Sequence, residues 1–208
     1  MMDGLGAGVE LEEKNREELE KVLEKAEQEA EAAEESKGGG AKELARDIAI
    51  AAVLALAVSF FIRPTIVYET SMQPTIDPHD YLLMSRQAYR TGKVERGDII
   101  IFKSDVENEE TGDKKLLIKR VIGVPGDVLT ISDGSLYING SKMEEPYLAG
   151  GATNGEVYNV KVGKDEVFVM GDHRTVSLDS RSFGCIKQDK IVGKAICKVW
   201  PFDEMRML

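Results

Sequence analysis

The pattern of hydrophobic and polar residues divides the chain into three segments. Residues 1–43 are polar, with only a thin stripe of Leu, Val and Ala at three- and four-residue steps. The run Ile48–Ile62 holds 15 residues with no charge and one serine. After Pro64, short apolar runs alternate with Gly, Pro, Asn and Asp. We therefore expect an acidic tail over 1–43, a membrane anchor over 44–63 and a folded domain over 64–208.

The tail carries most of the net charge of −10, because residues 1–43 hold 14 acidic and 6 basic side chains. Glu, Lys, Ala and Leu favour a helix, and a weak coiled coil or a partner-binding helix would fit the stripe. The stripe fades to alanine, however, which favours a solvated tail that is partly helical or disordered. Gly38-Gly39-Gly40 is expected to end the helix in a flexible joint. No partner for the tail follows from the sequence.

The apolar run is interpreted as a single, uncleaved transmembrane helix in contact with the lipid bilayer. A span needs roughly 20 apolar residues, and Arg46 and Arg63 could snorkel at its two ends. A buried core helix should show a polar face, and a cleaved signal peptide should lie near residue 1. Because Lys37, Lys42 and Arg46 precede the run, we expect the N-terminus in the cytoplasm and residues 64–208 on the extracytoplasmic side of the cell membrane.

The body is expected to be mostly β, an antiparallel sandwich or barrel. Asp133-Gly134 and Asn139-Gly140 are typical hairpin turns on either side of a three-residue run. The candidate strands are Tyr81–Arg86, Asp98–Lys103, Leu116–Val121, Val128–Ser132, Leu136–Ile138, Glu156–Val162, Glu166–Met170 and Lys190–Trp200.

The composition argues against several classes of function. The acidic balance argues against nucleic acid as a partner. Two Cys and two His without ligand spacing argue against a zinc site, and no glycine-rich phosphate loop is present, so we expect neither metal nor cofactor. Cys185 and Cys197 could form a disulfide or pack as small apolar residues, and the sequence leaves both open.

Two residues suggest a serine hydrolase. Ser71 lies in Ser-Met-Gln-Pro-Thr, and Lys119 lies in an apolar strand where desolvation would lower its pKa, as a lysine base requires. A lysine at a strand edge that reaches solvent fits the strand pattern as well. A Ser-His-Asp arrangement would have to use His79 or His173. The residues alone therefore indicate a serine nucleophile with either a lysine or a histidine base.

Four segments in order, residues 71–75, 96–100, 119–127 and 171–184, resemble the sequence boxes of bacterial type I signal peptidases. The resemblance implies a membrane-bound serine endopeptidase that removes signal peptides from exported preproteins without a cofactor. It also implies that family's mostly antiparallel β fold. The roles implied are a nucleophile (Ser71), a general base (Lys119), a hydroxyl that orients the lysine (Ser177), a supporting ion pair (Asp179 and Arg181) with Arg120 nearby, and a shallow substrate pocket that admits small side chains (Met72, Pro74, Ile76 and Met84).

Two residues depart from the pattern of that family. His173 stands where Asn is usual, and Glu69, two residues before Ser71, stands where a small or hydroxylic residue is usual. A carboxylate beside the dyad would oppose the oxyanion and favour a charged Lys119. Either the chain turns Glu69 to solvent, or the carboxylate stays close and shifts the pH optimum upward. We expect the first, because an unpaired carboxylate in a dry site is costly.

Two alternatives have sequence requirements of their own. Self-cleaving stress-response repressors share the Ser-Lys dyad, but they carry a DNA-binding helical domain where this chain has an apolar run. A catalytically inactive, membrane-anchored binding protein would be expected to lack Ser71 or Lys119, and both are present.

Overall fold

A computed structural model of the chain describes residues 39–107, 112, 114–148 and 150–208, together with 21, 24, 25 and 28. The chain divides into two compact units, residues 1–60 and 61–208. The acidic tail expected over 1–43 lies almost wholly outside the described residues. The second unit holds every residue considered below as part of a site.

Helix α2 runs from Gly39 to Phe61. It begins inside the glycine joint expected from the sequence, so Gly39 and Gly40 start a helix. It ends before Ile62, which together with Arg63 belongs to the first strand. Within the described ranges, no helix combines the length and the apolar character needed to cross a bilayer.

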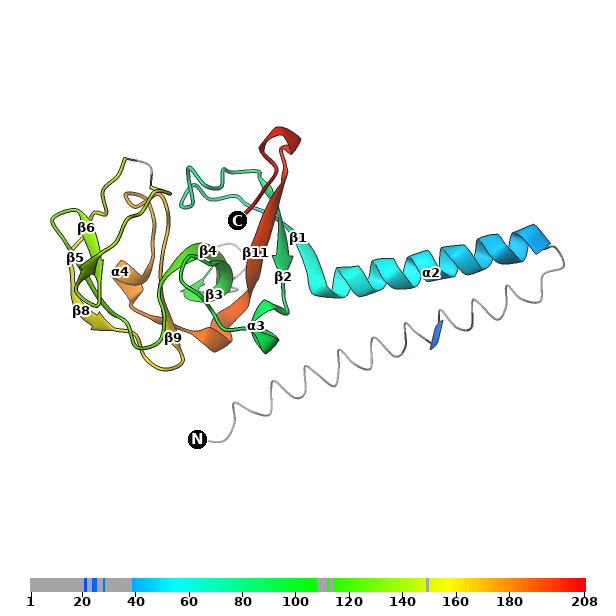
Figure 1. The fold of residues 1–208 in the computed structure, drawn as a ribbon, viewed down its shortest axis with the longest axis horizontal. Coiled ribbons are helices and arrows are strands. Elements are labelled where there is room, and N and C mark those ends of the chain that lie inside the picture. The colour runs from blue at the N-terminus through cyan, green and yellow to red at the C-terminus, as the bar shows by residue number, and fades with distance from the viewer. Residues whose placement is uncertain are drawn as a thin grey trace. The chain divides into compact units, whose positions relative to one another are not determined.

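The second unit is built from two antiparallel sheets (Figure 1). The larger has the order β1-β2-β11-β3-β4-β9-β10, with β12 paired to β11, and the smaller has the order β7-β6-β5-β8. The elements are β1 (Ile62–Ile66), β2 (Tyr81–Ser85), α3 (Ala88–Thr91), β3 (Ile99–Glu107), β4 (Lys114–Gly123), β5 (Val128–Ser132), β6 (Ser135–Ile138), β7 (Ser141–Lys142), β8 (Val157–Lys161), β9 (Glu166–Met170), α4 (Ser180–Phe183), β10 (Ile186–Lys187), η1 (Gln188–Lys190), β11 (Ile191–Trp200), η2 (Phe202–Glu204) and β12 (Arg206–Met207).

The mostly antiparallel β architecture expected from the sequence is confirmed, and each of the eight candidate strands is present with small shifts at its ends. The strands that the sequence pattern did not predict are β1, β7, β10 and β12. Three of these are only two residues long, too short for an alternating pattern to be recognised. The remaining strand, β1, begins where the apolar run ends, so the sequence pattern did not separate the strand from the run.

Strand β4 occupies the middle of the larger sheet, between β3 and β9. Its residues Ile118 and Leu117 belong to two different apolar clusters, so both faces of the strand are covered. A side chain at the centre of β4 therefore cannot reach solvent past a free edge. This position decides the chemistry of Lys119.

A buried ion pair ties the loop between β1 and β2 to strand β11. The loop closes on itself because Val67 N donates to Asp80 O at 3.0 Å. The Asp80 carboxylate lies 2.6 Å from Lys198 Nζ, and Lys198 is fully buried. Lys198 Nζ also lies 2.6 Å from the half-exposed Glu204 carboxylate. Both ends of the loop that carries Ser71 are therefore held in place.

Removing the charge of Asp80 is expected to destabilise the fold. Asp80→Asn leaves the Lys198 ammonium buried with one solvent-exposed partner, which should lower the free energy of unfolding by about 3 kcal/mol. The matched control Glu204→Gln should cost less than about 1 kcal/mol, because water can replace its carboxylate. Denaturant unfolding followed by fluorescence of Trp200, the single tryptophan, measures both. Equal losses for the two variants would contradict this account.

Candidate active site

Lys119 and Ser71 meet in the interior of the second unit. Lys119 is 1% exposed and Ser71 6% exposed. Lys119 Nζ lies 2.7 Å from Ser71 Oγ and 2.9 Å from the carbonyl oxygen of Ile118. The alternative of a strand-edge lysine that reaches solvent is therefore wrong, because β4 is flanked on both sides. The structure brings the expected nucleophile and base within hydrogen-bond distance.

Burial lowers the pKa of Lys119 below that of an ordinary lysine, because the ammonium loses its hydration. The carboxylates of Glu69, Asp179 and Asp172 oppose this shift, and the charge of Lys115 adds to it. The net direction favours the neutral amine. A neutral amine next to a serine hydroxyl can accept its proton, as a general base must.

Ser71 sits in a tight turn whose apolar residues face the core. Ile76 N donates to Met72 O at 2.9 Å, and both side chains are fully buried. The carbonyl oxygen of Ser71 accepts a hydrogen bond from His173 N at 3.0 Å. The turn is therefore held from the core side by packing and from the other side by the loop that follows β9.

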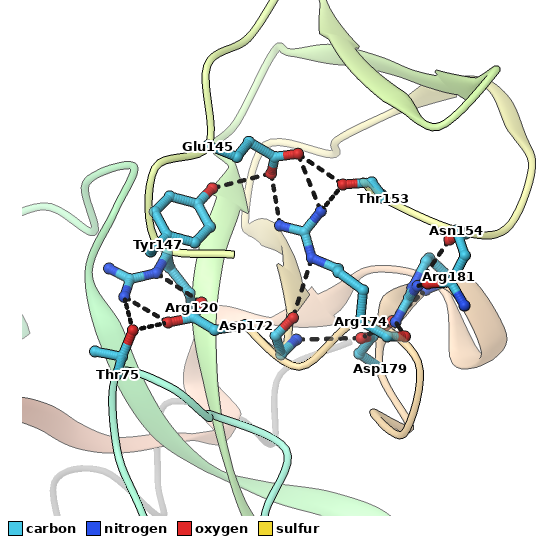
Figure 2. A network of polar contacts seen from close by, with 11 residues as sticks. Thr75, Arg120, Glu145, Tyr147, Thr153, Asn154, Asp172, Arg174, Asp179 and Arg181 are labelled. Carbon is cyan, nitrogen blue, oxygen red and sulfur yellow. Dashed lines mark hydrogen bonds and ion pairs between the residues drawn. The ribbon is translucent and has the colours of Figure 1, made fainter. Parts of the chain in front are cut away.

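That following loop is held by the expected pair Asp179 and Arg181 (Figure 2). The fully buried Asp179 carboxylate accepts from Arg181 Nε and Nη2, both at 2.8 Å, and from Gly171 N at 3.1 Å. Arg181 Nη1 donates to the carbonyl oxygen of Asn154 at 2.8 Å. The pair thus fixes both ends of the 171–181 segment.

Arg120, the neighbour of Lys119 on β4, binds a different carboxylate. Its Nε and Nη2 donate to the two oxygens of Asp172 at 2.9 and 2.7 Å. Asp172 also accepts from Thr75 Oγ1 at 2.6 Å, and the Arg120 guanidinium lies 4.3 Å from the centre of the Tyr147 ring (Figure 2). Arg120 therefore joins the Ser71 turn to the loop after β9.

A third arginine–carboxylate network, around Arg174, was not predicted from the sequence. Arg174 donates from Nη2 to Glu145 at 2.5 Å, and both side chains are buried. Glu145 also accepts from Thr153 Oγ1 at 2.7 Å and from Tyr147 at 3.0 Å (Figure 2). Arg174 lies within residues 171–184, a segment that resembles a sequence box of type I signal peptidases. Glu145 lies in a loop without any distinguishing pattern.

Ser177 differs from its expected role in one respect. Its Oγ is buried and has no hydrogen-bond partner among the described residues, so it does not contact the Lys119 amine here. It does lie close to the nucleophile, because a Cβ added to Gly171 would collide with both Ser177 Oγ and the carbonyl oxygen of Ser71. Position 171 therefore has room only for glycine.

A cleft of about 330 Å³ opens beside the dyad. It is lined by Tyr68, Glu69, Thr70, Ser71, Val106, Lys115, Leu117, Lys119, Val176 and Leu178. Val106, Val176 and Leu178 are exposed apolar side chains. The cleft thus has an apolar rim, with Ser71 and Lys119 at its floor.

The predicted substrate pocket does not coincide with this cleft. Met72, Ile76 and Met84 belong to one buried core cluster, and neither they nor Pro74 line the cleft. The reason is the turn after Ser71, which directs Met72 and Ile76 into the core. From the sequence, an apolar residue that supports a nucleophile cannot be distinguished from one that touches substrate.

The prediction for Glu69 is also wrong. Its side chain is 32% exposed, lines the cleft with the dyad, and lies 2.6 Å from Lys115 Nζ. The expected cost of an unpaired carboxylate is avoided by this partner rather than by a turn to solvent. His173 Nδ1 lies 3.3 Å from the carbonyl oxygen of Thr70, and the ring of His79 packs on Tyr68.

Neither cysteine forms a disulfide: Cys185 and Cys197 are both free thiols. In the part of the chain that the structure describes, no three His, Cys, Asp or Glu side chains come together as a group able to hold a metal ion.

Fold and site together define an antiparallel β protein with a buried serine–lysine pair. Residues 41–200 match the family described as signal peptidase, peptidase S26. The chain is 39% identical over 175 residues to signal peptidase I T of Bacillus subtilis (strain 168), which covers 79% of this chain and 88% of that one. It is 34% identical over 178 residues to signal peptidase IB of Staphylococcus aureus (strain COL), with coverages of 76% and 89%. The chain belongs to the S26 family of signal peptidases.

A crystal structure of a signal peptidase I from Enterococcus faecalis V583 is also similar, at 32% identity. The match has a TM-score of 0.42 and covers 50% of this chain and 97% of the solved one.

Replacing Lys119 by an apolar side chain is expected to stabilise the fold. Below the lowered pKa of Lys119 the native state buries an ammonium, and Lys119→Met removes that cost. Between this pKa and the ordinary lysine pKa the unfolded chain binds more protons, so the parent protein becomes more stable as pH rises. The advantage of Lys119→Met should therefore be largest below the lowered pKa and shrink as pH rises towards the ordinary lysine pKa.

Denaturant unfolding at several pH values measures this advantage. The exposed Lys114, also on β4, provides the control, because Lys114→Met removes no buried charge and should bring no gain in stability. A Lys119→Met variant less stable than the parent at every pH would show that the lysine is not buried at a cost.

Proposed function

We infer that this protein is a serine endopeptidase that cleaves signal peptides from exported preproteins, with Ser71 as the nucleophile and Lys119 as the general base. The observation that carries the proposal is the 2.7 Å separation of Lys119 Nζ and Ser71 Oγ in a buried site. Membership of a family of signal peptidases supports the substrate.

The reaction follows from this geometry. Neutral Lys119 accepts the proton of Ser71 as Oγ attacks the scissile carbonyl carbon, and the carbonyl oxygen becomes an oxyanion. We expect backbone N–H groups of the turn that carries Ser71 to stabilise that charge. The lysine then gives its proton to the departing amine, which leaves an acyl-enzyme. Lys119 next takes a proton from water as its oxygen attacks the acyl carbon, and then gives that proton to Ser71 Oγ as the bond to the acyl group breaks, which releases the signal peptide and restores the neutral dyad.

The surrounding charges position this pair. Asp179 with Arg181, and Asp172 with Arg120, hold the loop after β9 against the Ser71 turn. We propose that the unpaired hydroxyl of Ser177 orients the Lys119 amine when the proton moves, because it lies beside Ser71 and has no other partner among the described residues.

For the N-terminal part we propose a single-span anchor over 44–63, with the tail in the cytoplasm and the catalytic domain outside. Support comes from the sequence: residues 48–62 carry no charge, and Lys37, Lys42 and Arg46 precede them. An anchored domain would meet signal peptides where they leave the bilayer. The self-cleaving repressor and the inactive binding protein are not favoured, since the relatives are signal peptidases and the dyad is intact.

Cleavage should depend on both members of the dyad. Ser71→Ala and Lys119→Ala should each abolish processing of a labelled preprotein by the detergent-solubilised full chain. Lys119→Arg should fail as well, since a guanidinium stays charged. In the parent, kcat/KM should rise from neutral to mildly alkaline pH as Lys119 loses its proton. Processing that survives in Lys119→Ala but is lost in His173→Ala would disprove the lysine base.

The proposed orientation can be tested with single thiols in a chain that carries Cys185→Ser and Cys197→Ser. In intact cells, a membrane-impermeant maleimide should label Lys161→Cys, an exposed position of the catalytic domain. The same reagent should label Ser36→Cys only after the cells are permeabilised. The reverse pattern would contradict the orientation, and release of the protein by alkaline carbonate would contradict the anchor.

A further inference from the structure

The cleft beside the dyad contains a second pair of charged side chains. Glu69 Oε1 lies 2.6 Å from Lys115 Nζ, and both residues line the cleft together with Ser71 and Lys119. Their side chains are 32% and 46% exposed, so the pair stands at the mouth of the cleft, whereas the dyad is buried at its floor.

The two pairs come from the same two segments. Lys115 and Lys119 are four residues apart on β4 and therefore share one face of the strand. Glu69 and Ser71 are two residues apart on the segment that faces it. The chain thus places a carboxylate and the reactive amine in one cleft, where a free carboxylate would compete with Ser71 for that amine.

Accepting the proposed function, we propose that Lys115 is a positioning residue of the active site: its ion pair with Glu69 holds that carboxylate away from Lys119 and offsets part of its charge in the cleft. Lys119 then keeps its contacts with Ser71 Oγ and the carbonyl oxygen of Ile118.

The other acidic groups around Lys119 are also paired with a basic side chain. Asp179 and Asp172 both act on Lys119 through their charge. Asp179 is paired with Arg181 at 2.8 Å, and Asp172 with Arg120 at 2.7 Å. With Glu69 paired to Lys115, each carboxylate that faces the amine has its own cation. Lys115 extends to the mouth of the cleft an arrangement that the two arginines make in its interior.

The pairing has a definite consequence for pH dependence. Without Lys115, the lone charge of Glu69 stabilises protonated Lys119 and raises its pKa, so the acidic limb of kcat/KM moves to higher pH. Without Glu69, the lone charge of Lys115 disfavours protonated Lys119, so the limb moves to lower pH. Removing both charges leaves the limb between those of the two single variants, because the charge of Glu69 acts on Lys119 more strongly than that of Lys115.

The test is a double-mutant cycle on the full chain in detergent, with kcat/KM for one preprotein measured against pH. Lys115→Gln should move the acidic limb upward by roughly one unit, and Glu69→Gln should move it downward. The limb of the double variant should lie between those of the two single variants. Lys114→Gln is the matched control, because this neighbouring lysine pairs with Asp105 and does not line the cleft.

The proposal is overturned by an unmoved limb in Lys115→Gln, by an equal shift in Lys114→Gln, or by a double variant whose limb lies outside the range set by the two single variants. A general loss of rate without a shift would indicate a structural role for Lys115 and would also overturn it.

A second measurement separates this proposal from the proposed function. The ε-carbon shift of Lys119, followed by NMR against pH and assigned with Lys119→Ala, reports protonation without any cleavage. If the parent cleaves no preprotein, the proposed function fails. An upward displacement of this titration in Lys115→Gln would still support the electrostatic role of Lys115, and an unchanged titration would exclude it.

Discussion

The short contact between Lys119 and Ser71 sets the requirements that the rest of the domain has to meet. It joins residues 48 positions apart and lies in the interior, where an ammonium is poorly solvated. A lysine can be held there only by a strand covered on both faces and paired on both edges, which is the position of β4. The cost of that burial is the source of the proposed reactivity, so stability and activity oppose each other at this residue.

The polar network around the dyad also holds Ser71 and Lys119 in position, through ion pairs. Arg120, Arg174 and Arg181 each bind a buried carboxylate and tie together segments distant in sequence. Paired in this way, the carboxylates fix the loops while adding little net charge near Lys119. The core cluster that contains Met72 and Ile76 holds the Ser71 turn from the opposite side. Serine and lysine are thus aligned by supports on independent elements.

Much of this could be predicted from the sequence, for identifiable reasons. Alternating apolar residues and Asn-Gly or Asp-Gly turns locate strands because both follow from backbone geometry, and the candidate strands are present. The residues alone left a lysine or a histidine base open, and the resemblance to type I signal peptidases assigned the roles to Ser71 and Lys119. The substrate pocket stays a prediction: Met72 and Ile76 lie in a core cluster and not in the lining of the cleft, and their direction depends on a turn that no sequence pattern reveals. Glu69 was misplaced because its partner, Lys115, lies 46 residues away on another element.

The Glu69–Lys115 pair is exposed and the Lys119–Ser71 pair is buried, so the two pairs respond differently to dissolved salt. Mobile ions reach Glu69 and Lys115, whose side chains are 32% and 46% exposed, and weaken their field over about 8 Å at physiological ionic strength. They do not enter the contact between Lys119 and Ser71, which stays unscreened. The salt concentration therefore changes the electrostatic field at the mouth of the cleft, but it does not change the contact between Lys119 and Ser71 at the floor. The electrostatic surroundings of the lysine vary with the medium, whereas its geometry does not.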